Sequence, residues 1–158
     1  MVYDCFPVFA LLVLATFPFL PFLNGRVLVA EEAGLLAHLY HLVQLVVVAG
    51  FFVYFWTSRG QTLGMLAWRL RLQRPDGSLI SPAIALKRLG VLFLLCLPVL
   101  IGYWQIWHGW PREARIAANV VSLLPLVAAY LWIWIDRDGL AWHDRWTDTR
   151  VVVLPKRK

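Results

Sequence analysis

The chain has 158 residues, of which 61% are hydrophobic, and a formal net charge of +6 at pH 7. Its mean hydropathy is +0.68, and soluble domains use only about 45–50% apolar residues. This composition excludes an ordinary soluble domain and favours one domain, residues 1–158, embedded in a bilayer.

Four apolar runs approach the length of about 20 residues that a membrane-spanning helix needs. They cover residues 5–23, 35–56, 89–107 and 116–135. Prolines interrupt the first and third runs, and a spanning helix accommodates proline where neighbouring groups satisfy the freed carbonyls. We therefore expect kinks and not extra loops, and we predict an all-α membrane protein with four transmembrane helices.

The basic residues predict the orientation, because they are retained on the cytoplasmic side. Of the 15 lysines and arginines, all but three lie in the loop 57–88 and the tail 136–158. The three exceptions are Arg26, Arg112 and Arg115. We expect both termini in the cytoplasm and attraction to anionic lipid headgroups. Nucleic acid is not an expected partner, because no basic run is interleaved with aromatic residues.

The loop after the second run has two patterns of its own. Residues 60–68, "GQTLGMLAW", favour a short interfacial helix that turns Leu63, Leu66 and Ala67 toward the lipid. In residues 68–73, "WRLRLQ", apolar and polar residues alternate, which predicts a strand.

A turn and two further strands complete the predicted cytoplasmic cap. Asp76 and Gly77 supply turn chemistry, and residues 78–81 are expected to return as a second short strand. Residues 149–155 of the tail are a third candidate, and a lone strand is unstable. We therefore expect the tail strand to pair with residues 68–73.

The acidic residues of the tail lie among basic ones, so we expect structural ion pairs. Asp144 and Asp148 are expected to pair with Arg145, Arg150 and arginines of the middle loop. The acidic spacing does not match a calcium loop, and no His/Cys metal spacing is present. We predict neither a metal nor a cofactor; haem is disfavoured because two histidines on one helix face cannot bind opposite sides of one iron.

Several short motifs together resemble the RDD family of bacterial multispanning membrane proteins. They are "YD" at the first run, "GQTLG" after the second, a "DG" turn and a terminal "HDRWTDTRVV", so the resemblance covers nearly the whole chain. The positions concerned are Asp4, Gly60, Gln61, Thr62, Gly64, Asp76, Gly77, His143, Asp144 and Thr149.

The resemblance maps the two aspartates of the family onto Asp4 and Asp144. The arginine of the family would precede Asp4, where this sequence has Met1, Val2 and Tyr3. An arginine encoded upstream would restore the charge pair. The resemblance implies a location in the bacterial cytoplasmic membrane and transport of an unidentified ligand, but no specific chemistry.

Polar residues near or within the spans are the candidates for a function. Asp4 is either paired with a basic side chain or an ion or proton site, because carboxylates at membrane depth are costly. His38, His41 and Gln44 share one face of the second span, and either line a proton or cation path or form interhelical hydrogen bonds.

Two function classes follow from these residues. The first is a small transporter of ions or protons, which we expect to assemble with further copies or a partner membrane protein. The second is a non-transporting scaffold or accessory subunit that recruits a partner through its cytoplasmic cap. No nucleophile elbow, Walker loop or HExxH motif is present, so enzyme activity is not expected.

Overall fold

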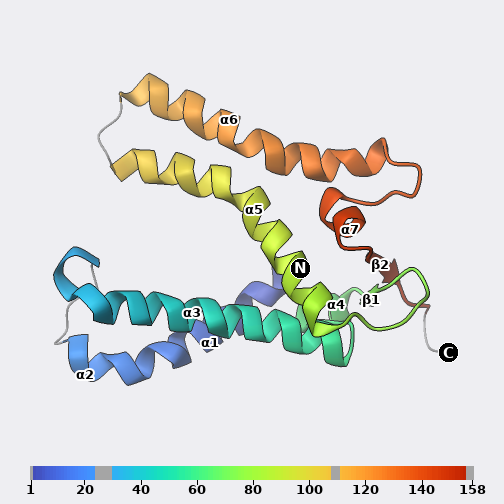
Figure 1. Ribbon diagram of the computed structural model, residues 1–158, viewed down its shortest axis with the longest axis horizontal. Coiled ribbons are helices and arrows are strands. Elements are labelled where there is room, and N and C mark those ends of the chain that lie inside the picture. Colours follow the sequence, from blue (N-terminus) through green and yellow to red (C-terminus); the bar gives the residue numbers. More distant parts are fainter. Residues whose placement is uncertain (1, 24–29, 108–110, 156–158) are drawn as a thin grey trace. The chain divides into compact units, whose positions relative to one another are not determined.

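The computed structural model of the protein describes residues 2–23, 30–107 and 111–155. These residues fall into two compact units (Figure 1). The first unit comprises Met1–Leu72 with Val152–Lys158, and the second comprises Gln73–Val151.

The first unit is built on a pair of helices that lie side by side, α1 (Cys5–Thr16) and α3 (Ala30–Ser58) (Figure 1). The 3-10 turn η1 (Val2–Asp4) precedes α1. A second 3-10 turn, η2 (Phe17–Phe19), leads into α2 (Leu20–Leu23) and carries Pro18 in its first turn. Pro18 therefore lies in a 3-10 turn, and no loop interrupts the first span.

The short helix α4 (Leu63–Ala67) follows α3 and packs against η1. Leu63, Leu66 and Ala67 are exposed, whereas Gly64 and Met65 are buried. This confirms the predicted short helix with an apolar outer face.

The second unit contains α5 (Pro82–Trp107), α6 (Arg112–Leu131) and the short helix α7 (Trp142–Trp146). The 3-10 turn η3 (Trp132–Trp134) extends α6. The helix α5 packs along α6 and against α7 (Figure 1). Its start is capped by the Ser81 hydroxyl, which accepts a hydrogen bond from the amide of Ile84 at 3.4 Å.

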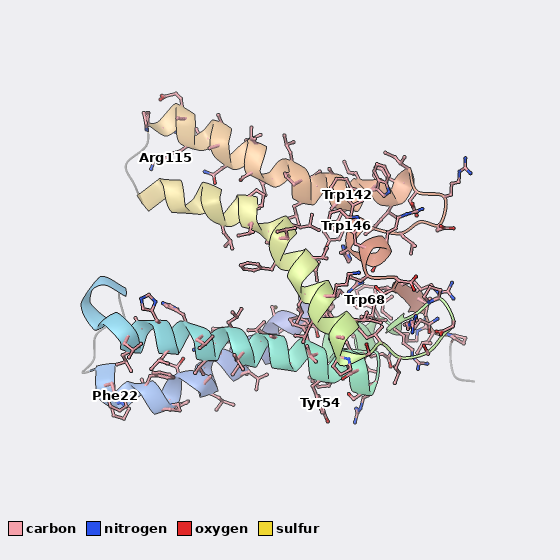
Figure 2. All side chains as sticks on the ribbon, viewed as in Figure 1. Phe22, Tyr54, Trp68, Arg115, Trp142 and Trp146 are labelled. Carbon is pink, nitrogen blue, oxygen red and sulfur yellow. The ribbon has the colours of Figure 1, made fainter. Side chains whose placement is uncertain are left out.

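Among the residues that the structure describes, four helices are long and apolar enough to cross a membrane: Cys5–Phe22, Gly34–Ser58, Pro82–Leu100 and Arg112–Trp134. They coincide with the four predicted runs, although the third begins earlier because its helix starts at Pro82. Their large apolar side chains point outward, as Figure 2 shows for Phe22 and Tyr54, which are 66% and 65% exposed. Such surfaces need lipid or other apolar partners around them.

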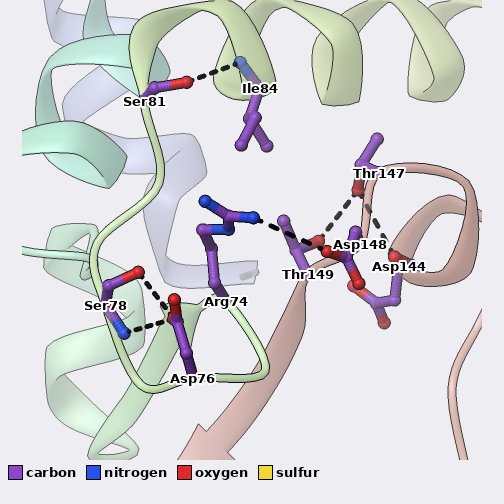
Figure 3. A network of polar contacts seen from close by, with 9 residues as sticks. All are labelled: Arg74, Asp76, Ser78, Ser81, Ile84, Asp144, Thr147, Asp148 and Thr149. Carbon is purple, nitrogen blue, oxygen red and sulfur yellow. Dashed lines mark hydrogen bonds and ion pairs between the residues drawn. The ribbon is translucent and has the colours of Figure 1, made fainter.

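The strands β1 (Leu70–Gln73) and β2 (Arg150–Val153) form a two-stranded sheet. The predicted pairing of the tail with the middle loop is therefore confirmed. The predicted strand over residues 78–81 is wrong, because these residues have no strand structure. The Asp76 carboxylate binds the amide and hydroxyl of Ser78, which holds the chain in a tight turn (Figure 3).

Candidate functional site

The carboxylate of Asp4 lies at the centre of a polar cluster in the first unit. One oxygen, Oδ2, accepts a hydrogen bond from the Thr62 hydroxyl at 2.8 Å, and Oδ1 accepts one from the Gly64 amide at 2.7 Å. Asp4 is only 2% exposed and Thr62 only 1%. A buried carboxylate is thus joined to a segment about 60 residues away in sequence.

The "GQTLG" segment has the local conformation that this contact needs. Gly60 has a φ of +68°, a value that favours glycine, and its carbonyl accepts a hydrogen bond from the Leu72 amide at 2.7 Å. Thr62 is extended and caps α4, since its hydroxyl also accepts a hydrogen bond from the Met65 amide at 3.3 Å. Gln61 adds a hydrogen bond from Nε2 to the Leu70 carbonyl at 2.7 Å.

Gly64 is required by the closeness of Asp4. A Cβ atom at this position would lie 2.7 Å from Oδ2 and 2.8 Å from the backbone nitrogen of Asp4. Both distances are shorter than a normal van der Waals contact, and the backbone atom cannot move without moving η1. The absence of a side chain at Gly64 is what lets its amide reach the carboxylate.

The partners of Asp4 in this unit are neutral hydrogen-bond donors. Within the described part of the unit, no basic side chain forms an ion pair with Asp4. The Asp4 carboxylate is thus held by a hydroxyl and an amide of the segment that follows α3.

The other polar candidates lie elsewhere in the first unit. Gln44 on α3 donates from Nε2 to the Leu12 carbonyl at 3.2 Å and to the Thr16 hydroxyl at 3.0 Å, both on α1. His38 and His41 are exposed on α3. Gln44 thus makes interhelical hydrogen bonds. The structure brings none of these three residues to Asp4, because Thr16 lies twelve residues along the first span, about 18 Å at 1.5 Å per residue.

The second unit contains a separate buried cluster around Arg88. This arginine is fully buried in α5, and its Nη2 lies 2.6 Å from Oδ1 of Asp144 at α7. Its Nη1 donates a hydrogen bond to the Thr149 hydroxyl, which in turn lies 2.9 Å from the Thr147 hydroxyl. Figure 3 shows Asp144, Thr147 and Thr149 gathered at the turn that follows α7. The cluster ties the tail to the start of α5.

His143 borders this cluster. Its Nε2 lies 3.7 Å from Oδ1 of Asp144, and its ring is 5.6 Å from that of Tyr130. Burial is the main reason that the pKa of His143 lies below its usual 6.5. The carboxylate of Asp144 opposes this shift, and the guanidinium of Arg88 adds to it. The site therefore favours a neutral imidazole.

Two further ion pairs involve charges of the tail. Arg145 binds Asp136, and Arg74 lies 3.9 Å from Asp148 (Figure 3). Arg150 donates to the Pro75 carbonyl. The expected pairing of Asp144 and Asp148 with arginines of the middle loop is thus confirmed. Asp144 pairs with Arg88 because α5 directly contacts α7.

The Asp76–Gly77 turn, the last of the predicted signature positions, is exposed. Hydrogen bonds from the hydroxyl and amide of Ser78 hold the pKa of Asp76 below its usual value. Gly77 has a φ of +83° and donates to the Arg74 carbonyl at 2.9 Å. These residues serve the turn. In the described parts of the chain, no three His, Cys, Asp or Glu side chains are grouped to hold a metal ion.

A pocket of about 480 Å³ opens on the second unit next to the Arg88 cluster. Its lining residues are charged or polar for the most part. They are Pro75, Asp138, Leu140, Asp144, Arg145, Asp148, Thr149 and Arg150. The pocket lining thus carries both signs of charge.

Comparison with known proteins identifies the family. Searches of the curated proteins and of the solved structures gave no match. The sequence model of the RDD family matches residues 1–148. The match includes all four candidate spans, the Asp4 cluster and the Arg88 cluster, except for Thr149, which lies one residue beyond it. The chain is therefore a multi-pass membrane protein that belongs to the RDD family.

Proposed function

We propose that this protein translocates a proton or a small cation, and that the Asp4 carboxylate is the group that binds it. The observation that carries the proposal is that a carboxylate 2% exposed has neutral donors as its partners in its own unit. A buried negative charge whose described partners are neutral donors is costly. Binding of a proton or a cation removes that cost, and its release restores it.

The path is proposed to form between copies of the chain. The exposed His38 and His41 of α3 are then at an interface, where they extend the polar line that includes Gln44. The stretch of about 18 Å between Thr16 and Asp4 is apolar within α1, so a second chain must supply polar groups or water there. A homo-oligomer is the simplest assembly that meets this need.

The proposed setting is the bacterial cytoplasmic membrane with both termini in the cytoplasm. The support is the excess of basic residues in the loop 57–88 and the tail, compared with three on the opposite side. The same charges favour anionic headgroups as neighbours. The proposal includes no enzymatic reaction.

Proton or cation flux into liposomes tests the proposal. Purified protein is reconstituted around a pH-sensitive dye, and a potassium gradient with an ionophore supplies the driving force. We expect Asp4→Asn to abolish the flux, whereas Asp148→Asn, at an aspartate whose side chain is 70% exposed, leaves it unchanged. Size-exclusion chromatography establishes that both variants are folded. Flux that persists in folded Asp4→Asn would overturn the role of Asp4, and the absence of any flux in the unaltered protein would overturn translocation.

A second candidate is a scaffold that recruits a partner through its cytoplasmic face. Two observations favour it. The stretch of α1 between Asp4 and Thr16 is apolar and offers no path for an ion, and the pocket of about 480 Å³ beside Asp144 offers a polar surface for a partner. For this function, a photo-reactive group placed at the exposed Asp138 should cross-link one partner in cells. Arg145→Glu, which reverses a charge in the pocket lining, should remove that product, whereas the exposed Arg137→Glu, which is outside the lining, should not.

A further inference from the structure

A hollow of about 430 Å³ lies beside the outer face of α4 in the first unit. We call it the α4 hollow; it is lined by Gln61, Leu66, Arg69, Leu154 and Pro155. Its one charged lining residue is Arg69, and three of the other four are apolar. The hollow thus combines one positive charge with an apolar wall.

Arg69 occupies a backbone conformation that an arginine rarely adopts. Its φ is +54°, in the left-handed region that favours glycine or asparagine. The backbone contacts of Arg69 do not depend on its side chain: its amide donates to the Leu66 carbonyl at 3.1 Å, and its carbonyl accepts from the Leu154 amide at 2.7 Å. A glycine would make the same bonds without strain, so the conformation does not explain the guanidinium. An outlier of this kind points to a function for the side chain.

The surroundings of Arg69 indicate what the guanidinium meets. Leu66 and Trp68 are 58% and 59% exposed, and Figure 2 labels Trp68 on this segment. Within the described residues, Arg69 forms no ion pair with an acidic side chain. Exposed leucine and tryptophan next to arginine are typical of a segment at the boundary between headgroups and acyl chains.

The α4 hollow also follows a candidate membrane span closely in the sequence. The span Gly34–Ser58 ends five residues before α4 begins at Leu63. Arg59, between them, is exposed and adds a second positive charge. The apolar surface of the span therefore leads directly to a basic segment at its end.

We propose that the α4 hollow binds the headgroup of an anionic phospholipid. The guanidinium of Arg69 takes the phosphate, for which its planar fork is suited, and an acyl chain lies on Leu66 and Trp68. This site is separate from the Asp4 carboxylate and does not depend on translocation. It gives the chain a specific lipid contact in addition to the general attraction of its basic residues.

Lipid binding to the purified full-length chain in uncharged detergent tests the proposal. Phosphatidylglycerol is titrated, and the bound lipid is counted by native mass spectrometry, with phosphatidylcholine as the comparison. We expect Arg69→Gly to weaken phosphatidylglycerol binding about tenfold, the loss expected for one charge-assisted hydrogen bond to the phosphate. The matched control is Arg137→Gln, another exposed arginine, which should change binding less than twofold.

Two further measurements make the result specific. Arg69→Gly removes the strained φ, so its melting temperature without lipid should be no lower than that of the unaltered protein. If Arg69→Gly does melt at a lower temperature, Arg69→Asn replaces it as the test variant, because asparagine also tolerates this φ. Equal losses in Arg69→Gly and Arg137→Gln would overturn the site, as would equal binding of phosphatidylcholine. Displacement of the lipid by inorganic phosphate at the same concentration would also overturn it, because the ligand would then be a small anion.

Discussion

Replacing Gly64 with alanine should destabilise the protein, although alanine is normally the better helix residue. The new Cβ would lie 2.7–2.8 Å from the carboxylate and the backbone nitrogen of Asp4. Overpacking of this kind costs about 1–3 kcal/mol. The helix preference for alanine offsets about 0.5–1 kcal/mol of that cost. We expect a net loss of about 1–2 kcal/mol, or about 2–8 °C in melting temperature for a chain of this size.

The assay is heating of the detergent-solubilised protein followed by size-exclusion chromatography with fluorescence detection. Gly50→Ala is the matched control, because Gly50 is also helical and a Cβ there would meet nothing within 4 Å. It should leave the melting temperature unchanged or raise it slightly. If Gly64→Ala is as stable as Gly50→Ala, the close approach of α4 to Asp4 is wrong, and with it the hydrogen bond from the Gly64 amide.

Three other predictions concern the two polar clusters. Thr62→Val should cost about 1–3 kcal/mol in the same assay, because it removes a donor to the buried Asp4, whereas Thr62→Ser should keep most of the stability. Asp144→Asn alone or Arg88→Met alone should lower the free energy of unfolding by about 3–5 kcal/mol. The double variant should lose less than the sum of the two single losses in a double-mutant cycle. Losses that simply add would contradict the ion pair. The pKa of His143 is lowered in the folded state, so the unfolded chain binds the extra proton first. The melting temperature should therefore fall as the pH decreases below about 6.5, and His143→Gln should make the melting temperature less dependent on pH in that range. An unchanged pH dependence in His143→Gln would count against a buried neutral imidazole.

The membrane helices were predictable because their signal is one of length and composition. All four spans follow from runs of apolar residues that no soluble core needs. The paired strands were also predictable. Apolar and polar residues alternate in the strand before Arg74, and residues 149–155 of the tail were a strand candidate that could pair with it. The failure at residues 78–81 has a local cause, since the Asp76 carboxylate accepts a hydrogen bond from the Ser78 amide, which a strand would need for its own pairing.

The sites were predictable only in part, because partners distant in sequence leave no local pattern. Asp4 and Thr62 could be named as candidates, but nothing in the sequence says that they touch. Arg88 was counted among the basic loop residues, although it is the fully buried partner of Asp144. The one available signal was its place: it lies seven positions into α5, where the helix leads from a polar loop into an apolar run.

The bond between Asp4 and the Gly64 amide sets a condition on biogenesis. The two residues are 60 positions apart, which at about 5–20 residues per second corresponds to about 3–12 seconds of synthesis. During that interval the first hydrophobic segment has left the ribosome, but the Gly64 amide that donates to Asp4 has not yet been made. Because Asp4 lies just before the span and not inside it, water can solvate the carboxylate until the GQTLG segment arrives. A slower ribosome over codons 5–64 would therefore lengthen the period in which the nascent chain is exposed to quality-control proteases.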